Sequence, residues 1–504
     1  MNIKEILKKK IIKEVLTIYK ADWTILIYDA VAGEIMIDLF TKSELNDYSI
    51  AEAFLINAQK PERDFPAIYF ISGTNENYDL INKEFSINKF SKYQAIIIEI
   101  VDNPSRLNKL IKSTVIPCKI KPQEERIFTT EYENSIRTMQ FLLESEFNIY
   151  KMPCLQKIPK FDTKKFNHEG DFLLLDRSFD LFTPLIHFLT FKSIISEIEG
   201  ANGEFNENTK LCKEVRYRHL ADINKILQYN INKLNQNMEN LNKKLTTTEL
   251  SKMVLDAPEN IKLKESVEKY SNLLRDAFIK LDYLQEPISK DAIFNSLIES
   301  ELSLVTGMKN GKKIKIDLSG IFDLLGSTRL MKTDKLRLLY LIKFKGVRLT
   351  LTERNILKQS GFDAEDIDLK IDLNNKYKRE KELTFKYDIS RFEPYIADII
   401  KDCLLGDFRS FLIKANNLEV QNEEKEVFSL RKTSMLAVKK QSKSRKKIVV
   451  YIKNGLTIEE CRLAYDLSEA LGIELFLGSE RILKPNQIIE IIKEKYKRKE
   501  PTEI

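Results

Sequence analysis

The chain has 504 residues, of which 43% are hydrophobic, and this length predicts two or three domains. Charged residues make up 31% of the chain, and both signs are spread along it. The net charge of +7 therefore does not indicate a nucleic-acid-binding protein. It suits acidic partners or a nearby membrane surface. Residues 1–20 lack the features of a signal peptide and no apolar run approaches the ~20 residues that cross a bilayer, so we expect a cytosolic protein that meets membranes only peripherally.

The cysteines and histidines argue against disulfides and metal centres. No cysteine lies in a CxxC pair, and cysteines scattered through a long chain are typical of reduced core residues. With only three histidines, a His/Cys metal site is not expected, and we expect no cofactor. The residues concerned are Cys118, Cys154, Cys212, Cys403 and Cys461, and His168, His187 and His219.

The first 118 residues alternate between helix and strand patterns. Three mainly apolar runs, at 23–28, 67–71 and 95–101, are each bounded by turn or polar residues. Mainly apolar strands between helices are typical of a parallel sheet that is covered on both faces. The sequence therefore predicts an α/β domain over residues 1–118.

A second sheet is predicted after a polar connection. A helix is expected around 134–147, and a buried strand at 172–175 follows and ends at Asp176. Thr183 is then expected to cap a helix that has Pro184 at its first position, where proline is favoured.

Residues 210–284 carry apolar residues three or four positions apart over two long stretches. Such stripes predict two long helices that pair as a hairpin, with most of the second stripe packed within the chain. Pro258 lies between the stripes and is expected to break or bend the chain. The first stripe comprises Leu220, Ile223, Leu227, Ile231, Leu234, Met238, Leu241 and Leu245, and the second comprises Leu263, Val267, Tyr270, Leu274, Ala277, Leu281 and Leu284.

The C-terminal part returns to an α/β pattern after a polar stretch at 421–447, whose basic end we interpret as a solvated loop. Apolar strands are expected at 448–452 and 473–477, and residues 457–460 form a capping box that opens a helix between them. One βαβ tail cannot bury its own sheet. We therefore expect these strands to complete the sheet that contains 172–175.

The end of the strand at 172–175 carries the residues most relevant to chemistry. An enzyme would use Asp176 and Asp180 as metal ligands, or Asp176 as a phosphoryl acceptor, because ligands bind at the ends of parallel strands. The alternative is that Arg177 pairs with a carboxylate and fixes a loop, and we favour it because no glycine-rich phosphate loop is present. His187 is more typical of a packed residue than of a base.

Other glycine and serine patterns give weak signals. Gly33, Gly73 and Gly478 are interpreted as isolated turn glycines, and Gly478 with Ser479 after a strand could also cradle an anion. No GxSxG motif is present, so a hydrolase triad has no anchor.

The segment around Asp176 resembles the signature of a known family. Residues 173–180 read Leu-Leu-Leu-Asp-Arg-Ser-Phe-Asp and residues 183–187 read Thr-Pro-Leu-Ile-His, which is similar to the signature of the Sec-one/Munc-eighteen (SM) family. Because four further stretches match that family in order along the chain, the protein is identified as a member, most like the exocytic branch. These stretches are 65–71, 218–223, 390–395, and 448–457 with 477–479.

The resemblance implies an arch-shaped fold with two α/β domains, each with a parallel sheet, and a mainly helical domain with a long hairpin. Domain 1 would span 1–118, domain 2 would combine 119–205 with 430–504, and domain 3 would span 206–429 with its hairpin at 210–284. The resemblance also implies a set of structural signature residues. They are Asp176, Arg177, Asp180, Pro184, His187, Arg391 and Pro394.

The implied function is to bind SNARE helices and to template or regulate SNARE-complex assembly in vesicle docking and fusion, without enzymatic activity. The expected partners are a syntaxin-like SNARE, the assembled SNARE bundle and a vesicle SNARE at the hairpin, with the protein a monomer that SNAREs recruit to the plasma membrane. The expected contact residues are Glu34, Lys42, Glu52, Leu107 and Leu110 in domain 1, and Pro258 and Leu274 in the hairpin.

The chain also departs from the family pattern. The basic residue with which domain 1 holds syntaxin falls at Glu34, and residues 113–121 are shortened, so binding of closed syntaxin and binding of the bundle both stay open. Two other classes stay open as well. An α/β enzyme acting on nucleotides or sugars would be revealed by nucleotide binding, and a helical scaffold of a vesicle-tethering complex would bind no SNARE.

Overall fold

The computed structural model divides the chain into two compact units. Unit 1 comprises Met1–Arg177, Asp402–Leu456 and Leu463–Arg481, and unit 2 comprises Ser178–Lys401, Thr457–Arg462 and Ile482–Ile504. The structure describes residues 2–19, 22–61, 64–162, 168–197, 205, 209–241, 247–283, 293–309, 312–313, 316, 318–369, 392–406, 412–414 and 445–496. Among these residues, no helix has both the length and the apolar character needed to span a membrane.

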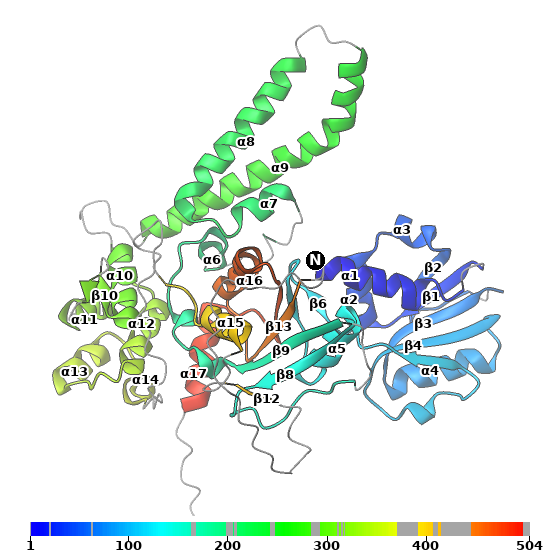
Figure 1. Ribbon diagram of the computed structural model, residues 1–504, viewed down its shortest axis with the longest axis horizontal. Coiled ribbons are helices and arrows are strands. Elements are labelled where there is room, and N and C mark those ends of the chain that lie inside the picture. The colour runs from blue at the N-terminus through cyan, green and yellow to red at the C-terminus, as the bar shows by residue number, and fades with distance from the viewer. Residues whose placement is uncertain are drawn as a thin grey trace, which may run out of the picture. The chain divides into compact units, whose positions relative to one another are not determined.

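Unit 1 contains a five-stranded sheet in the order β2-β1-β3-β4-β5, with every neighbouring pair parallel (Figure 1). The central strand β3 is buried along its whole length, as expected for a strand covered on both faces. The predicted parallel sheet and its strands at 23–28, 67–71 and 95–101 are confirmed. The strands are β1 (Thr24–Tyr28), β2 (Ile50–Leu55), β3 (Pro66–Gly73), β4 (Lys92–Ile100) and β5 (Lys112–Val115).

The two edge strands, β2 and β5, lie outside the prediction because their sequences mix polar and apolar residues. Helices precede, connect or follow the strands of unit 1. They are α1 (Ile3–Ile11), continued by a π-helical turn (Ile12–Leu16), α2 (Ala30–Leu39), α3 (Lys42–Asp47), α4 (Asn75–Ser86) and α5 (Ser135–Leu143).

A second sheet of unit 1 joins distant parts of the chain in the order β12-β8-β9-β13-β14-β7-β6. Strand β13 lies between β9 and β14 and is parallel to both, with Val450 opposite Leu173 on one side and Leu477 on the other. The prediction that the C-terminal strands complete this sheet is confirmed. The strands are β6 (Lys121–Pro122), β7 (Ile127–Thr129), β8 (Ser145–Lys151), β9 (His168–Asp176), β12 (Ile413–Lys414), β13 (Lys447–Lys453) and β14 (Glu474–Ser479).

The helix predicted at 134–147 is too long. It ends at Leu143, because Glu144 adopts the left-handed conformation with φ +47°, and strand β8 begins at the next residue. Alternate residues of Ser145–Lys151 are buried, so their polar and apolar residues follow the period of a strand rather than that of a helix.

The glycine interpretations need two corrections. A Cβ atom at Gly478 would lie 2.2 Å from the Phe128 ring, and the buried Ser479 hydroxyl donates to the Ile452 carbonyl, so these residues serve close packing and not an anion cradle. Gly33 lies inside helix α2 against the Tyr28 ring and is not a turn glycine.

Unit 2 is mainly helical and is built on one hydrophobic core. Helix α16 (Ile458–Leu471) belongs to unit 2 as far as Arg462 and to unit 1 from Leu463. It begins with the predicted capping box, in which the Thr457 amide donates to the Glu460 carboxylate at 2.8 Å and the Glu460 amide donates to the Thr457 hydroxyl at 3.2 Å. The other helices are α6 (Phe191–Ser196), α7 (Lys210–Val215), α8 (Leu220–Leu241), α9 (Thr247–Tyr283), α10 (Ile293–Thr306), α11 (Leu318–Gly326), α12 (Lys332–Phe344), α13 (Leu351–Gln359), α14 (Ala364–Asp368), α17 (Pro485–Tyr496) and α15 (Ile396–Leu405), which belongs to unit 1 from Asp402. A two-stranded sheet pairs β10 (Met308–Lys309) with β11 (Lys312–Lys313).

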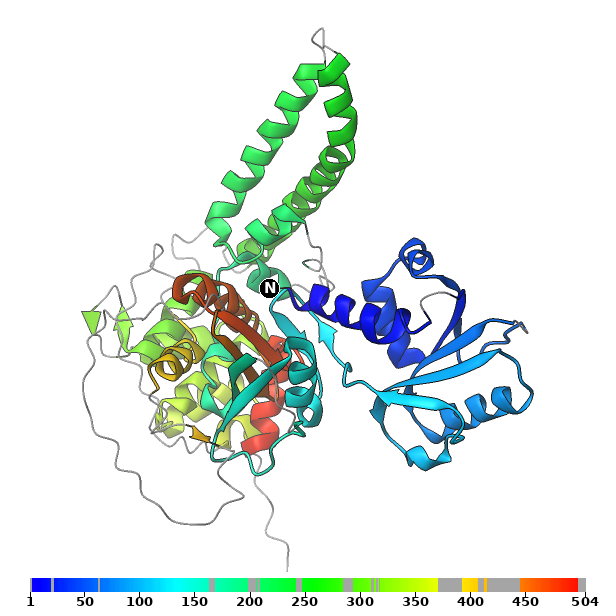
Figure 2. The same ribbon diagram turned by 45° about the vertical axis from the view of Figure 1, so that its right-hand side comes forward.

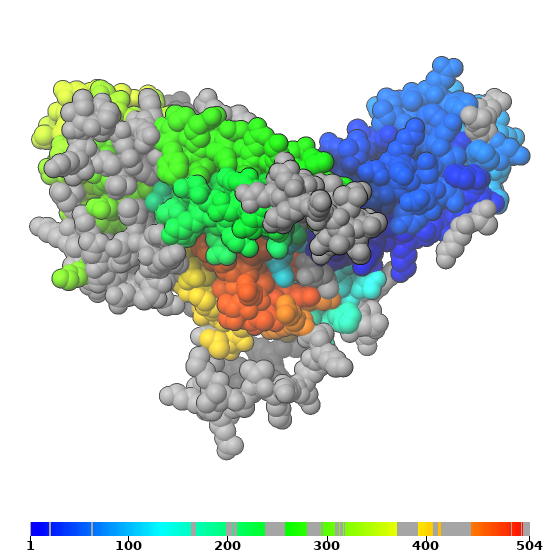
Figure 3. Space-filling model, turned by 90° about the horizontal axis from the view of Figure 1, so that it is seen from above, coloured from blue at the N-terminus to red at the C-terminus, as the bar shows by residue number. Residues whose placement is uncertain are grey.

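The predicted helical hairpin is confirmed as α8 and α9, which Figure 2 shows side by side and Figure 3 views from above. Of the two effects expected of Pro258, a break or a bend, the break does not occur. Pro258 lies exposed inside α9, which continues on both sides of it, because an existing helix can tolerate one missing N–H donor where the chain faces solvent.

The basic stretch at 421–447 falls largely outside the described residues, which resume at 445. Its end is not a solvated loop: Lys446 pairs with Asp171 at 2.7 Å, and the buried Lys447 ammonium donates to the Leu143 carbonyl at 3.1 Å and to the Ser145 hydroxyl at 3.0 Å. The boundaries of the three expected domains stay a prediction.

Candidate functional site

The first polar cluster of unit 2 is organised by Asp180, one of the signature residues. One carboxylate oxygen accepts from the amides of Phe182 and Thr183, both at 3.0 Å, and the other accepts from the Thr183 hydroxyl and from the Tyr395 amide, the latter at 3.2 Å. Thr183 therefore begins a single 3-10 turn (Thr183–Leu185) and is not the cap of the expected helix. Because both oxygens of Asp180 are used as acceptors of protein donors, the carboxylate has a structural role and does not suit a metal ligand.

The neighbouring signature residues also have structural surroundings. In unit 1, Arg177 is 1% exposed and donates to the Gly455 carbonyl at 3.4 Å, while the half-buried Asp176 accepts from the Asn454 side chain at 3.1 Å. The expected pairing of Asp176 with Arg177 stays a prediction.

The four remaining signature residues fall within the range of unit 2. Pro184 and Pro394 are buried, whereas Arg391 lies outside the described residues. His187 follows the 3-10 turn instead of lying one turn into a helix, as was expected, because the turn ends at Leu185 and the chain becomes extended at Ile186.

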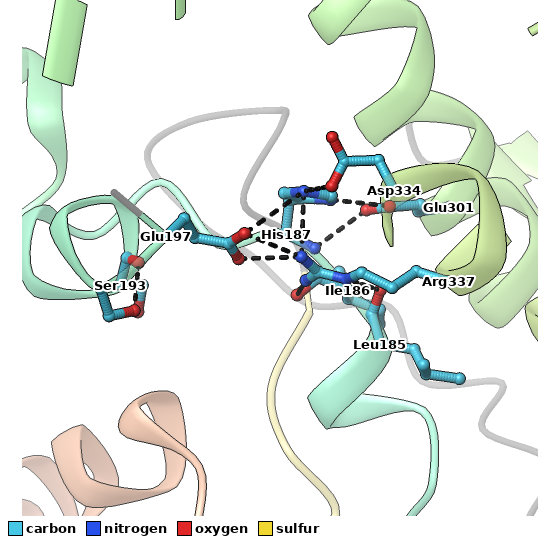
Figure 4. Close-up of polar contacts among 9 residues, drawn as sticks. Leu185, Ile186, His187, Ser193, Glu197, Glu301, Asp334 and Arg337 are labelled. Atoms are coloured by element: carbon cyan, nitrogen blue, oxygen red, sulfur yellow. Dashed lines mark hydrogen bonds and ion pairs between the residues drawn. The ribbon is translucent and has the colours of Figure 1, made fainter. Parts of the chain in front are cut away.

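His187 lies at the centre of a buried ion network in unit 2, formed with Glu197, Glu301, Asp334 and Arg337 (Figure 4). Its Nδ1 lies 2.8 Å from Glu301 Oε1 and its Nε2 lies 3.2 Å from Asp334 Oδ1. The other oxygen of Glu301 accepts from the His187 backbone amide at 2.9 Å, so Glu301 holds both the ring and the chain of this residue.

Arg337 closes the network from helix α12. Its Nη1 lies 2.9 and 3.0 Å from the two carboxylate oxygens of Glu197. Its Nε and Nη2 donate to the carbonyls of Leu185 and Ile186 at 3.0 and 2.9 Å. The network thus ties the chain around the signature Pro-Leu-Ile-His to helices α10 and α12, with His187 buried between them.

The network carries two cations among three carboxylates. Burial and the nearby Arg337 disfavour protonation of His187, but Glu301, Glu197 and Asp334 outweigh them and raise its pKa to about 10. Although burial also opposes the charge on Arg337, the same three carboxylates raise the pKa of its guanidinium. Both side chains are therefore charged at neutral pH.

A divalent metal could be imagined here, since His187, Glu197 and Asp334 offer ligand atoms that all lie within 4.8 Å of one another. Two observations argue against it. Both ring nitrogens of His187 already lie within hydrogen-bond distance of protein carboxylates, Nδ1 of Glu301 and Nε2 of Asp334. Moreover, Arg337 Nη1 lies 3.0 Å from His187 Nε2 and contacts both oxygens of Glu197, so a guanidinium already supplies the positive charge that a metal ion would bring to these side chains.

Unit 1 has a second candidate site, a hollow of about 280 Å³ that we call the acidic hollow. Helix α2 forms one wall, with Glu34 and Asp38, and the segments at 119–122 and 129–131 form another. Four carboxylates line it, from Glu34, Asp38, Glu131 and Glu480, together with the lysines Lys119 and Lys121.

Helix α2 is fixed in place at its first turn by the buried Asp29. This carboxylate caps the helix through the Ala32 amide at 2.9 Å and accepts from the Ser72 amide at 2.7 Å and the Asn77 side chain at 3.2 Å. The wall that carries Glu34 is therefore anchored to the ends of β1 and β3 and is preformed.

The expected contact residues of unit 1 have different surroundings. Glu34 and Lys42 are exposed, Glu52 is half-buried on β2, and Leu110 is 80% exposed. Leu107 is 6% exposed within the core beneath the first sheet, so its assignment as a partner contact is corrected to core packing. Of these five residues only Glu34 lines the acidic hollow.

The two expected contact residues of the hairpin, Leu274 and Pro258, also differ in burial. Leu274 is 7% exposed and belongs to the core of unit 2 with Val267, Tyr270 and Ala277, so it too is a packing residue and not a partner contact. Pro258 is exposed, and further along the hairpin Tyr229 is 70% exposed and Ile261 59% exposed. One face of α9 is thus packed within the chain, whereas other apolar side chains of the hairpin, including Phe278 and Ile279, are accessible.

Comparison with known families decides which family the chain belongs to. The model of the Sec1 family matches residues 143–491. The chain belongs to the Sec1 family. Its relatives include the protein transport protein sec1 of Schizosaccharomyces pombe, 19% identical over 93% of this chain and 81% of that protein, and the protein transport protein SEC1 of Saccharomyces cerevisiae, 21% identical over 77% of this chain and 65% of that protein.

Solved structures show that the whole fold is shared by the family. The chain is similar to the Unc18–syntaxin 1 complex from Monosiga brevicollis, with a TM-score of 0.75 and 16% identity over 98% of this chain and 99% of that one. It is also similar to the SM protein Vps45 in complex with the Qa SNARE Tlg2, with a TM-score of 0.71 and 13% identity over 98% of each chain. Sly1p with an N-terminal peptide of Sed5p gives a TM-score of 0.64 and 14% identity, over 98% of each chain. The expected SM fold, α/β with a helical part, is confirmed.

Sequence reasoning missed most of the ion network. Glu197, Glu301, Asp334 and Arg337 lie 10 to 150 positions away from His187. One signal was available: Glu301 follows Leu297 and Ile298 and precedes Leu302 on an apolar helix, and an ionisable residue on a buried face is found mainly where a partner neutralises it.

Proposed function

We propose that this Sec1-family protein binds SNARE proteins, a syntaxin-like SNARE above all, and templates or regulates the assembly of SNARE complexes during vesicle docking and fusion. Family membership over residues 143–491 carries the proposal. It is supported by the similarity over 98% of the chain to proteins solved with syntaxin 1 and with the Qa SNARE Tlg2.

In this proposal the chain acts by binding alone and makes or breaks no covalent bond. SNARE segments that are disordered in isolation must pay the entropic cost of ordering before their helices can zip together. A preformed surface that holds one or two of these segments in register reduces that cost. The exposed apolar residues of the hairpin, such as Ile261 and Ile231, are suited to hold an amphipathic helix of a vesicle SNARE.

The trafficking step proposed is exocytosis, with recruitment to the plasma membrane through SNAREs. The sequence signature favours this branch, and three relatives with the name sec1 support it, from S. pombe, S. cerevisiae and Dictyostelium discoideum. The similarity to Vps45 and Sly1p makes other branches of the family the alternatives. The experiment that tests the function therefore also tests the branch.

The test is to immobilise the purified full-length chain and to present it with the purified cytosolic parts of every syntaxin-like protein of its organism, one at a time. We expect stable capture of one of them, and of the SNARE complex built on it. If that syntaxin resides at the plasma membrane, the exocytic branch is supported, and if it resides at an internal compartment, the branch is wrong. Capture of tethering proteins with no syntaxin would contradict the proposed function, as would specific binding and hydrolysis of a nucleotide.

A further inference from the structure

We propose that the acidic hollow of unit 1 receives a lysine or arginine side chain from an amphipathic helix of the syntaxin-like partner. The inference rests on the proposed function and names the surface at which the chain would recognise its syntaxin-like partner. It assigns Glu34 and Asp38 as the residues that select this basic side chain, and it follows from the charge, the lining and the neighbouring surface of the hollow.

The first observation is an unbalanced pair of charges. Glu34 and Asp38 lie four positions apart on α2, so their carboxylates are neighbours on one face of the helix, and like charges at this spacing destabilise a helix. Among the described residues, neither side chain forms an ion pair or hydrogen bond. Such a repulsion between two carboxylates, with no contact in the folded chain to compensate for it, is typical of a functional position.

The lysines of the hollow do not neutralise this pair. Lys119 lies 2.7 Å from Glu99 and 2.7 Å from Glu131, and is thus engaged by two other carboxylates. Lys121 is exposed at the rim, on the edge strand β6. Two acidic groups on α2 are left facing solvent, and a basic group of a partner would pair with them.

The second observation is the apolar lining beneath these charges. Leu7, Ile35, Leu39 and Ile120 line the hollow and are each at most 8% exposed. Lysine and arginine bury a long aliphatic stem and keep a charged head at the end, so they match an apolar floor with an acidic wall. The volume of about 280 Å³ suits one inserted side chain and not a whole helix, whose diameter is about 10–12 Å.

The third observation identifies the kind of element that carries this side chain. Ile37 lies between Glu34 and Asp38 in the sequence of α2 and is 78% exposed, which leaves a branched apolar side chain in water next to the acidic wall. An amphipathic helix presents an apolar stripe flanked by charges, and it can cover Ile37 while a flanking basic residue enters the hollow.

The experiment compares binding of full-length variants to the cytosolic part of whichever syntaxin-like protein the wild type captures. The double variant Glu34→Gln/Asp38→Asn removes both charges with little change of shape, and Glu34→Lys/Asp38→Lys reverses them. Glu76→Gln is the matched control, because Glu76 is an exposed carboxylate on α4 of the same unit and does not line the hollow. Association rates and affinities are measured at low and at high ionic strength.

We expect Glu34→Gln/Asp38→Asn to weaken binding about threefold to tenfold at low ionic strength, mainly through slower association, and less at high ionic strength. The reversed variant should bind more weakly still, and exchanging the responsible basic residue of the partner for glutamate should restore its binding. Glu76→Gln should bind like the wild type. The neutral variant should melt at the same temperature as the wild type or slightly higher, because a repulsion is removed.

The outcomes separate the two proposals. If the wild type binds a syntaxin-like protein and both double variants bind it equally well at low ionic strength, the hollow is not the point of recognition and the inference is overturned, while the proposed function stands. If the reversed variant binds more tightly, the partner presents an acidic group there and the inference is likewise overturned. If the wild type binds no SNARE, the proposed function itself fails.

Discussion

At the scale of single residues, the ion network around His187 shows how a signature histidine can be structural. His187, Glu301 and Asp334 are all at most 5% exposed, and burying charges is costly unless each is paired. The network satisfies this condition by placing two cations between three carboxylates. The sequence predicted that His187 is packed, but its partners come from helices far along the chain, and no local pattern specifies which distant residues meet.

The first prediction concerns Glu301, which accepts from both the amide and the ring of His187. Glu301→Gln removes one negative charge and leaves two buried cations with two carboxylates. We expect unit 2 to lose about 3–5 kcal/mol of stability, because His187 loses the buried carboxylate that lies 2.8 Å from its ring. Hydrogen exchange of α10 and α12 during urea unfolding measures the loss. Asp323→Asn, at an exposed position of α11, is the control and should change stability by less than about 0.5 kcal/mol.

The second prediction is a dependence of stability on pH. The pKa of His187 is about 10 in the folded chain and its ordinary value is about 6.5, so the folded state holds one proton more than the unfolded state between these values. The stabilisation is complete below pH 6.5 and is lost as pH rises toward 10, with a slope of about 1.4 kcal/mol per pH unit.

Lys343 contributes in the opposite direction, because burial lowers its pKa to about 8 and its folded state holds fewer protons above that pH. The contribution of His187 is therefore measured as the difference in stability between the wild type and a variant that keeps Lys343. Urea midpoints of the wild type and of His187→Gln are compared at pH 7 and pH 9, and we expect the advantage of the wild type to shrink at the higher pH. An advantage that is constant or grows would show that His187 is neutral in the folded chain.

At the scale of elements, the sequence located most strands and helices but not all of their ends. Strands with continuous apolar runs, such as β3 and β13, were found because two-sided burial leaves a clear pattern. Strand β8 was taken for the end of a helix, because the stop at Glu144 depends on a left-handed backbone at a residue that seldom adopts it. Edge strands such as β2 were missed for the opposite reason: they are only half-buried.

The third prediction concerns Pro258, which lies inside α9 and faces solvent. Proline in a helix interior lacks one N–H donor and clashes with a preceding carbonyl, at a cost of about 3 kcal/mol. Pro258→Ala should therefore stabilise α9 and, under the proposed function, should bind a vesicle-SNARE helix more tightly and speed fusion in a reconstituted assay. Glu259→Ala changes the neighbouring exposed position without affecting the backbone and serves as control. Unchanged SNARE binding, with α9 shown to be stabilised, would contradict a role of this proline in binding.

The fourth prediction concerns the second sheet of unit 1. A chain truncated after Leu430 lacks β13 and β14, so β9 loses one of its two parallel neighbours and presents an unpaired apolar edge. We expect this protein to be insoluble or to lack a cooperative melt. If calorimetry of residues 1–430 showed a cooperative transition like that of the full chain, the C-terminal strands would not be needed to complete the sheet.

At the scale of the whole molecule, family membership was predictable because it rests on several short motifs in a fixed order, and each motif is local in the sequence. The candidate sites were less predictable. Glu34 was identified by its position, but the hollow that it lines also needs Lys119, Thr130 and Glu480, and only the folded chain brings these residues to one place. Leu107 and Leu274 were misassigned because an apolar residue on an amphipathic pattern does not reveal which neighbour covers it.

The last prediction follows from how unit 2 satisfies its charges. In a reconstituted fusion assay with the captured syntaxin and its partner SNAREs, the effect of the full-length chain should be unchanged by EDTA and by removal of nucleotides. The cluster of His187, Glu197 and Asp334 already holds the Arg337 guanidinium, and the sequence has no glycine-rich phosphate loop. EDTA should likewise leave the melting temperature of the chain alone unchanged, which separates an effect on this protein from an effect on the SNAREs. If EDTA lowered both the melting temperature and the fusion rate, and zinc or magnesium restored both, the cluster would be a metal centre, and its assignment as an ion network closed by Arg337 would be wrong.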